Sequence, residues 1–304
     1  MSSIATVTAT INGVTHPLTY NSSTGKWEAT LTAPSGSSFN QGGGYYNVSL
    51  SAEDEAGNIS TADATDAEIG TDLRLVVKEK VKPTVSIVSP GASAYLTTNM
   101  PVITAQLRDS DSGVKISTLS FKLDGVSIAY NAPGMTCTPV TGGYNISYTP
   151  QPALSDGAHT LTVAVTDNDG NVSTTASRSF TVDTVAPVLN VTTPAPGLIT
   201  NQTSGTVAGA TSDATSSPVT LTITVNGSSV GAVTVDGDGN FSKAVTYAEG
   251  SNTVVITATD SAGKTTSVTR TLTVDTVPPA FVSVTLAPNP VDAGQTYILS
   301  VSLS

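Results

Sequence analysis

Aspartates are the residues of this sequence best suited to chemistry, because several stand in turns or directly after predicted strands. Carboxylate oxygens in such places are ligands that calcium prefers. We expect two sets to converge, namely Asp109 and Asp111 with Asp183, and Asp213 with Asp275. Each set would hold calcium near a junction between predicted modules and stiffen it. The alternative is that all five are solvated turn residues, and no other cofactor is expected.

A second acidic stretch, Asp236-Gly237-Asp238-Gly239-Asn240, resembles the opening of an EF-hand calcium loop, with oxygen ligands at alternate positions. No glutamate stands where the last ligand of such a loop belongs, and the residues that follow, FSKAVTY, alternate as a strand does. The stretch is therefore predicted to be a hairpin turn.

Catalytic groups are sparse. The two histidines are His16, next to Pro17 after a predicted turn, and His159, which opens a predicted strand. A general base must reach its substrate inside a pocket, and we expect both histidines to be packed or solvated structural residues instead. The sequence has no phosphate loop, zinc spacing or nucleophile elbow. No acidic pair lies outside a turn or linker, as glycoside hydrolysis would require, so the chain is not expected to be an enzyme.

The elements that position these residues recur along the chain. The segment TLTVAVTDNDGNVSTTASRSFTVDTVAP ends at Pro187, and TVVITATDSAGKTTSVTRTLTVDTVPP ends at Pro279. A weaker copy ends at Pro83. Each copy alternates apolar and polar residues on both sides of a turn that contains aspartate and glycine, which predicts a β-hairpin.

A second hairpin signal lies upstream in each repeat. Asn12-Gly13, Asp124-Gly125 and Asn226-Gly227 each stand between apolar alternating runs. Asn-Gly and Asp-Gly are the strongest short-range hairpin signals, because both residues tolerate a positive φ. The repeat unit is therefore all-β and about 100 residues long.

The TVDTVAP and TVDTVPP junctions, the ATDSAGK hairpin and the APNPVDAGQT segment resemble the bacterial immunoglobulin-like repeats of surface adhesins and of bacteriophage tail and other virion proteins. The resemblance implies an all-β fold of tandem immunoglobulin-like β-sandwiches. Prolines at the linkers should make the array rod-like. The expected domains are residues 1–82, which lack their first strands, 83–184, 185–277, and a partial domain of opening strands at 278–304.

The two ends of the chain are predicted to be complementary. Residues 1–82 reach the Asn12-Gly13 hairpin without opening strands, whereas residues 278–304 contain opening strands alone. Unpaired strands invite pairing with another chain, so the C-terminal strands should complete a sandwich in another copy or in a neighbouring virion or surface protein. The alternative is a frayed tail at a simple domain boundary. The apolar residues expected to make the assembly contact are Phe281, Val284, Leu286, Tyr297, Leu299 and Val301.

Charge and hydropathy limit the partners. The net charge is −11 and only 12 residues are lysine or arginine, so a nucleic-acid partner is not expected. No apolar run reaches the ~20 residues of a membrane span, and membrane insertion is not expected either.

The sequence is best interpreted as that of a tail-associated structural or adhesion protein of a phage particle, located in the virion. It rests on the resemblance, together with the absence of a segment of signal-peptide type and of a wall-anchor motif. The alternative is a secreted adhesin or filament subunit at the bacterial cell surface.

Four aromatic residues are candidates for a recognition surface, with a cell-surface glycan as the ligand, because tyrosine and tryptophan are enriched at binding sites. They are Tyr20, Trp27, Tyr45 and Tyr46. The alternative for Trp27 is a place in a sandwich core.

Overall fold

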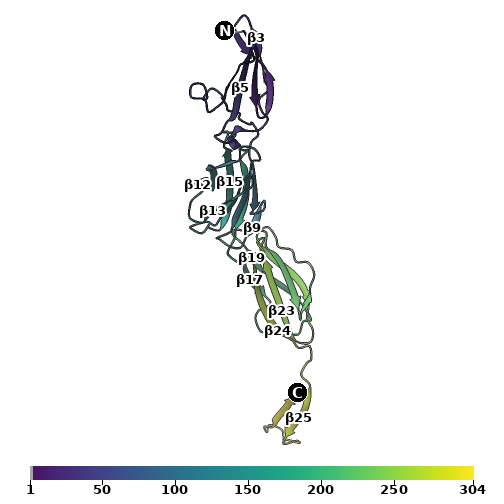
Figure 1. The fold of residues 1–304 in the computed structure, drawn as a ribbon. Coiled ribbons are helices and arrows are strands. Elements are labelled where there is room, and N and C mark those ends of the chain that lie inside the picture. The colour runs from purple at the N-terminus through teal and green to yellow at the C-terminus, as the bar shows by residue number, and fades with distance from the viewer. Residues whose placement is uncertain (1–2) are drawn as a thin grey trace. The chain divides into compact units, whose positions relative to one another are not determined.

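The computed structural model describes residues 3–304, which form β-strands and one 3₁₀ turn, η1 (Ser38–Asn40). These residues divide into two compact units, Met1–Val182 and Asp183–Ser304. The predicted all-β fold is confirmed (Figure 1). Among the residues described, no helix is long and apolar enough to span a lipid bilayer.

The second module, strands β8 to β16, is a sandwich of two sheets in the first unit. One sheet has the order β13 (Met135–Val140), β14 (Gly143–Tyr148), β10 (Ile103–Arg108), β8 (Thr84–Ser89). The facing sheet has the order β12 (Val126–Ile128), β11 (Val114–Leu123), β15 (Gly157–Asp167), β16 (Ala176–Val182), β9 (Ala94–Leu96). The short strand β9 pairs with β16 in parallel, and the other pairs are antiparallel.

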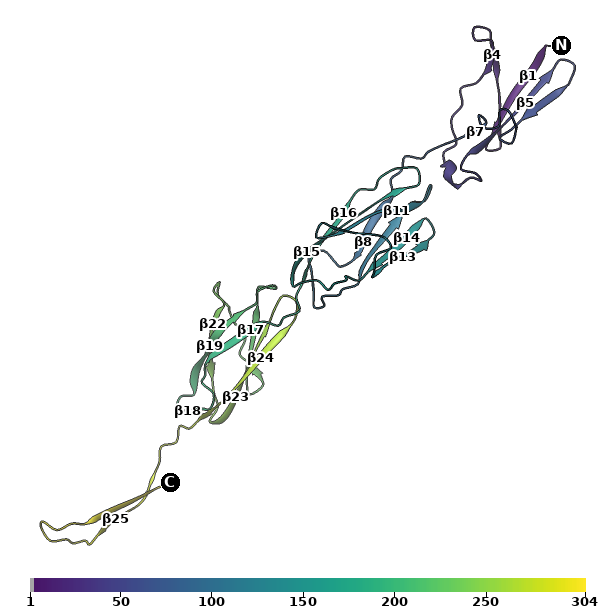
Figure 2. The ribbon, with the colours of Figure 1, turned by 90° about the vertical axis from the view of Figure 1, so that its left-hand side faces the viewer.

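The third module, strands β17 to β24, repeats this plan in the second unit. One sheet has the order β17 (Val188–Thr193), β19 (Ser204–Ser212), β22 (Asn240–Thr246). The other has the order β18 (Leu198–Thr200), β24 (Thr265–Val274), β23 (Gly250–Thr259), β20 (Thr220–Val225), β21 (Ser228–Ser229). Figure 2 shows the strands of this sandwich, with β17, β19 and β22 in one layer and β23 and β24 in the other.

Alternation along the strands builds both cores. On β15 every second residue points inward, and Leu161, Val163 and Val165 are almost completely buried. Fourteen buried residues make up the core of the second module and fourteen that of the third. Burial of this kind stabilises each side chain by about 1.5–3 kcal/mol, so each of these modules has a core of its own.

The predicted hairpins are confirmed. Strands β1 and β2, β11 and β12, and β20 and β21 meet at the Asn-Gly or Asp-Gly pairs. In the first of these turns Asn12 has φ +50° and Gly13 has φ +75°, as the right-handed twist of a two-residue hairpin requires. The acidic turns also close hairpins, between β5 and β6, β15 and β16, and β23 and β24.

The N-terminal module has one well-formed sheet and a small ribbon. The sheet has the order β2 (Val14–Pro17), β1 (Ile4–Ile11), β5 (Tyr46–Asp54), β6 (Ile59–Ala62), with β7 (Arg74–Leu75) also paired to β5. The ribbon contains β3 (Thr19–Asn21) and β4 (Lys26–Glu28), which pair only with each other among the described strands. Among the described residues of this module, four hydrophobic residues are buried: Ala9, Tyr46, Ala64 and Leu73.

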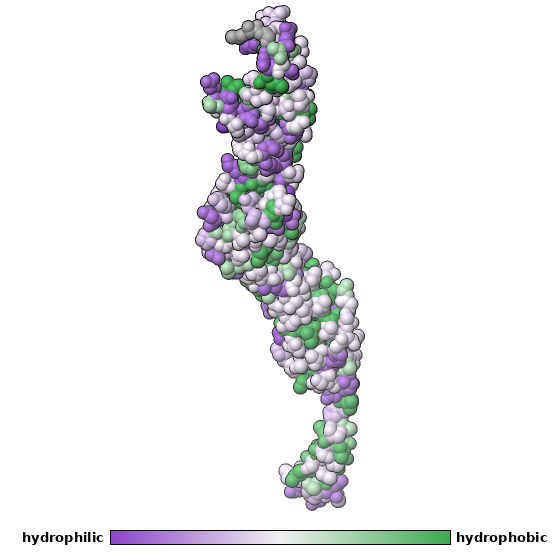
Figure 3. All heavy atoms as spheres, in the orientation of Figure 1, coloured by the Kyte–Doolittle hydropathy of each residue, from purple (hydrophilic) through white to green (hydrophobic). Residues whose placement is uncertain are grey.

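The last two strands, β25 (Phe281–Ala287) and β26 (Ile298–Leu303), form an antiparallel hairpin. Every residue from Asp275 to Ser304 is exposed. Figure 3 shows hydrophobic residues at the surface of this C-terminal hairpin. The segment therefore contributes to neither sandwich core.

The difference between open and closed modules can be measured at equivalent positions. Ile256 and Leu50 each lie four residues before the aspartate at the end of their strand, but Ile256 is buried and Leu50 is only half-buried. We expect Ile256→Ala to cost about 2–5 kcal/mol of local unfolding free energy, and Leu50→Ala roughly 1 kcal/mol. Hydrogen exchange of peptides from each module measures both values. Equal costs would contradict an open inner face in the N-terminal module.

Candidate metal centres at the ends of two modules

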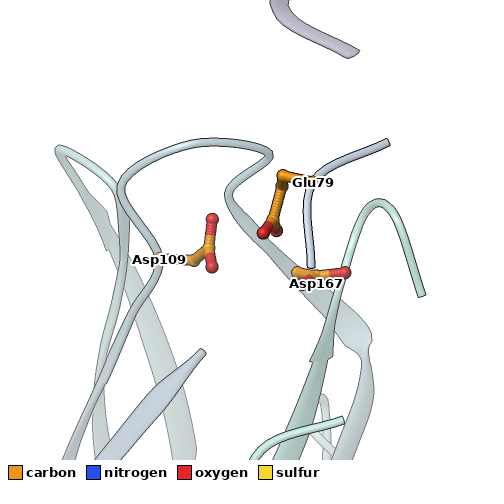
Figure 4. Close-up of side chains that lie close together, drawn as sticks. All are labelled: Glu79, Asp109 and Asp167. Carbon is orange, nitrogen blue, oxygen red and sulfur yellow. The ribbon is translucent and has the colours of Figure 1, made fainter. Parts of the chain in front are cut away.

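The second module gathers three acidic side chains at one end (Figure 4). Glu79 precedes the first strand, Asp109 follows β10 and Asp167 is the last residue of β15. All three are buried, and each offers a carboxylate oxygen within 4.8 Å of those of the other two. We call these residues the Glu79 cluster.

The third module gathers three acids at the equivalent positions. Asp183 precedes the first strand, Asp213 follows β19 and Asp260 follows β23. Their oxygens also lie within 4.8 Å of one another, with Asp183 and Asp260 buried and Asp213 half-buried. We call these residues the Asp183 cluster. Two strand ends on facing sheets and the incoming linker thus meet in the same way in both modules.

Hydrogen bonds fill much of the Glu79 cluster. Ser112 donates its hydroxyl to Glu79 at 3.1 Å, and Asn171 donates its side-chain amide to Asp167 at 2.8 Å and to Glu79 at 3.2 Å. Burial raises the pKa of Glu79, because desolvation disfavours its charged form, and the nearby Asp167 and Asp109 add to the rise. Desolvation also acts on Asp167, but donors led by Asn171 hold the pKa of that carboxyl below its usual value.

The Asp183 cluster is less satisfied. Ser216 donates its hydroxyl to Asp183 and its backbone N–H to Asp213 at 2.6 Å. The N–H of Lys264 reaches Oδ1 of Asp260 at 2.8 Å. Oδ2 of Asp260 is buried, in a residue only 5% exposed, and accepts no hydrogen bond from any described residue. A buried carboxylate oxygen without a partner is costly, and a cation among the three carboxylates would satisfy it.

Both donor sets fit a hard cation. Carboxylate oxygens, completed by backbone carbonyls or water, are the ligands of calcium. Ionised carboxylates this close together repel one another, and a positive charge between them would offset that repulsion. A calcium ion would supply that positive charge and tie the linker to two strand ends.

The five predicted calcium ligands are grouped differently from the expectation. Asp109 lies with Glu79 and Asp167, whereas Asp183 and Asp213 belong to one cluster with Asp260. Both carboxylate oxygens of Asp111 accept the backbone N–H of Ser37 at 3.0 Å. Asp275 is exposed and accepts the N–H of Val277 at 3.1 Å. Each linker acid is thus grouped with the strand ends of the module that follows it.

Glu79, Asp167 and Asp260 were missed as candidate ligands, although the sequence holds a signal for them. Glu79 precedes Asp109, and Asp183 precedes Asp213, by the same 30 residues, and each linker acid stands four residues before the linker proline. The equivalence of Glu79 and Asp183 is difficult to recognise, because the sequence around Glu79 differs from that around Asp183. Asp167 and Asp260 were interpreted only as turn residues, a role they also fill by accepting backbone N–H groups of their own hairpins.

The other candidate groups have structural roles in the described residues. Asp236 accepts the N–H groups of Asp238 and Asn240 at 3.0 and 2.8 Å, as the predicted hairpin turn requires. His159 is buried in β15, where Nδ1 lies 2.7 Å from a carboxylate oxygen of Asp124 and Nε2 lies 2.9 Å from the carbonyl oxygen of Ser155. The histidine therefore braces the Asp124-Gly125 hairpin.

The aromatic candidates do not form one surface. Tyr46 is only 7% exposed and donates its hydroxyl to the carbonyl of Gly36, so its assignment to a recognition surface was wrong. It is the first residue of β5 and points into the module. The guanidinium carbon of Arg74 lies over the ring of Tyr45, 5.0 Å from the centre of that ring. Tyr20 and Trp27 form a separate pair on the β3–β4 ribbon, with ring centres 5.8 Å apart.

Comparisons with known proteins agree with this fold. Residues 97–184 match the family model of a bacterial Ig-like domain, and residues 187–276 match that of domain B of glucodextranase. No curated protein sequence matches the chain.

Similar solved structures include the fibronectin(III)-like modules of Clostridium thermocellum CbhA, with 17% identity and a TM-score of 0.38 over 63% of this chain and 94% of that one. A 1.5-MDa bacterial ice-binding adhesin has 20% identity and a TM-score of 0.29 over 90% of this chain and 88% of that one. Sidekick-1 immunoglobulin domains 1–4 have 14% identity and a TM-score of 0.37 over 90% of this chain and 68% of that one. Likenesses of this size carry no argument about function.

Calcium should stabilise the third module through the Asp183 cluster. At a hundredfold excess over the dissociation constant, the gain is about 2.7 kcal/mol, or roughly 10–20 °C in Tm for a module of this size. Asp260→Asn should abolish the gain, whereas Asp238→Asn, in the exposed turn, should keep it. Thermal melts in calcium and in chelator measure the difference. A wild-type melt that calcium leaves unchanged would contradict a metal site.

In chelator, the raised pKa of Glu79 predicts a pH dependence. A carboxyl group whose pKa is raised on folding does not destabilise the folded state at a pH below its pKa in the unfolded chain, ~4.3. Stability is then lost as pH rises through the folded pKa. Glu79→Gln removes this loss, so the variant should melt higher than wild type at neutral pH, and the gap should close on acidification. Melts of both proteins across pH test this, and a gap that widens towards low pH would refute it.

Proposed function

We propose that this chain, which consists of tandem bacterial immunoglobulin-like repeats, is a non-enzymatic structural or adhesive protein. Architectures of this kind are typically non-catalytic. Residues 187–276 match domain B of the enzyme glucodextranase, but a match to this one domain is not evidence for catalysis.

The observation that carries the proposal is the position of the acidic clusters. In both modules the acids lie where the linker enters, and they join it to two strand ends. The N–H of Glu79 also donates to Asp169 at 3.0 Å, and the side-chain amide of Asn171 donates to the carbonyl of Glu79 at 3.1 Å. Groups placed in this way hold a linker against its own module, which suits a protein that transmits force or presents modules at a distance.

The location we propose is a phage particle, with the chain attached to the tail. Support comes from the resemblance of the TVDTVAP junctions and the ATDSAGK hairpin to repeats of phage tail and virion proteins. The same resemblance supports the alternative, a secreted adhesin or filament subunit of the bacterial surface. In either setting, the exposed Tyr20 is available, with Trp27 beside it, for contact with a cell-surface glycan.

A second part of the proposal concerns assembly. The C-terminal hairpin exposes Phe281 by 76% and Leu299 by 58%, and an isolated two-stranded hairpin is at best marginally stable in water. We expect its strands to complete a sandwich in a neighbouring subunit by β-strand addition.

Immunogold electron microscopy tests the location. Antibodies raised against the third module should label purified phage particles from the source culture, and should leave host cells without phage unlabelled. Label on the cell envelope alone would favour the surface adhesin. Label on neither would contradict both locations.

A further inference from the structure

We infer that the N-terminal module and the second module are held as one rigid body by a joint in which Asp111 binds the η1 turn. Both modules belong to the first compact unit. The joint has three parts, namely η1 of the N-terminal module, the linker at residues 77–79, and the loop at residues 109–113 of the second module. Each part is hydrogen-bonded to the other two. The joint is independent of the location and of the strand addition proposed above.

The first bonds join η1 to the loop. The backbone N–H of Ser37 donates to both carboxylate oxygens of Asp111 at 3.0 Å. Asn40, the last residue of η1, donates its side-chain amide to the backbone carbonyl of Asp111. Ser37 is only 2% exposed, so loss of this acceptor would leave its N–H poorly solvated. Because a bond to a carboxylate is stronger than one between neutral groups, and a buried N–H without a partner is costly, this contact favours the docked arrangement.

The second bonds join η1 to the linker. The N–H of Ser38 donates to the carbonyl of Val77 at 2.9 Å, and the N–H of Val77 donates to the hydroxyl oxygen of Ser38 at 3.1 Å. Both backbone groups of Val77 are thus paired with one buried residue of the preceding module. Rotation of the linker at Val77 would break both bonds.

The third bonds join the linker to the loop and hold the loop in shape. In the linker, Glu79 accepts the hydroxyl of Ser112 at 3.1 Å. One carboxylate oxygen of Asp109 accepts the N–H of Asp111 at 3.1 Å and that of Gly113 at 2.8 Å. Asp111 is therefore held in place within the second module, and this preorganisation lowers the entropic cost of its contact with η1.

Two features that build this joint are not repeated in the next module of the array. η1 lies in a long connection, residues 29–45 between β4 and β5, whereas only residues 149–156 join β14 to β15. Asp111 stands two residues after Asp109, but the residue two after Asp213 is Thr215, which has no carboxylate. The long connection and the acceptor carboxylate are therefore particular to the first two modules and are not part of the repeat.

Hydrogen exchange of the full chain, resolved to single amides, measures the contact itself. Asp111→Ala removes the acceptor, so the amide of Ser37 should exchange roughly ten to a hundred times faster, as expected for the loss of a hydrogen bond to a charged group. Ser110→Ala changes the neighbouring residue of the same loop, which is exposed. In this control the amide of Ser37 should exchange as in the wild type.

A pair of variants at Ser37 separates the backbone N–H from the side chain. Ser37 has φ −63° and ψ 140°, which proline also adopts, so Ser37→Pro deletes the N–H and keeps the backbone conformation. Ser37→Pro and Ser37→Ala both lose the hydroxyl that accepts the N–H of Phe39 at 3.0 Å, but Ser37→Ala keeps the N–H. Only Ser37→Pro should loosen the joint. Adding Asp111→Ala to Ser37→Pro should loosen it no further, because both changes remove the same bond.

Pulsed electron paramagnetic resonance measures the rigidity of the joint in the full chain. One spin label is attached to each module, at Ser60→Cys in β6 and at Ser177→Cys in β16, both exposed positions. The native thiol is removed by Cys137→Ser. The distance between the labels should have one narrow distribution in this chain and in the two control variants. The distribution should widen in the two variants that lack the contact, while the melting of the second and third modules stays the same in all of them.

Three results would overturn the inference. A wide distribution in the chain with an intact joint means that the two modules do not move as one body. A distribution that stays narrow in Asp111→Ala and Ser37→Pro means that the linker alone sets their orientation. Equal widening by Ser37→Ala and Ser37→Pro means that the cap of η1, and not the bond to Asp111, holds the joint. None of these outcomes bears on immunogold labelling of particles, so the joint can be disproved while the proposed function stands.

Discussion

Each sheet of this chain is apolar on one face, and that face must be covered by a second sheet. In the second and third modules the requirement is met, because the opening strands and their neighbours close over β11, β15 and β16 or over β20, β23 and β24. In the N-terminal module the β3–β4 ribbon does not pair with any other described strand, and the inward residues of β5 after Tyr46 are only half-buried. The C-terminal hairpin, in contrast, exposes apolar side chains that no described sheet covers. The strand addition that we propose for the C-terminal hairpin would meet the same requirement that closes the complete sandwiches.

The packing of two sheets also creates the acidic clusters. Strands that end side by side on facing sheets bring their last residues together, and the linker crosses the same end of the module. Three carboxylates buried there must share a proton, accept hydrogen bonds or bind a cation. The Glu79 cluster has donors and an acid of raised pKa, while the Asp183 cluster leaves one oxygen of Asp260 without a partner. Equivalent positions can therefore balance charge in different ways, and the third module has the stronger need for a metal ion.

The function that we propose from these features is mechanical rather than chemical. The acids that could do chemistry lie at linkers, and His159, the buried histidine, braces a hairpin. Cation binding at a linker would make the join between a module and its incoming strand stiffer, and strand addition would join one chain to the next. Both effects suit a structural or adhesive component outside the cytoplasm.

The hairpins and the alternating strands could be predicted from the sequence, because turn chemistry and side-chain periodicity are local properties. The amphipathic C-terminal strands were predicted for the same reason. The grouping of the acids could not be predicted, because Asp109 and Asp167, or Asp213 and Asp260, are brought together only when two sheets pack face to face. The burial of Tyr46 likewise depends on its direction at the start of β5, which the residue type does not specify. Local pattern thus determined the strands and turns, while long-range sheet packing decided which charged and aromatic side chains meet.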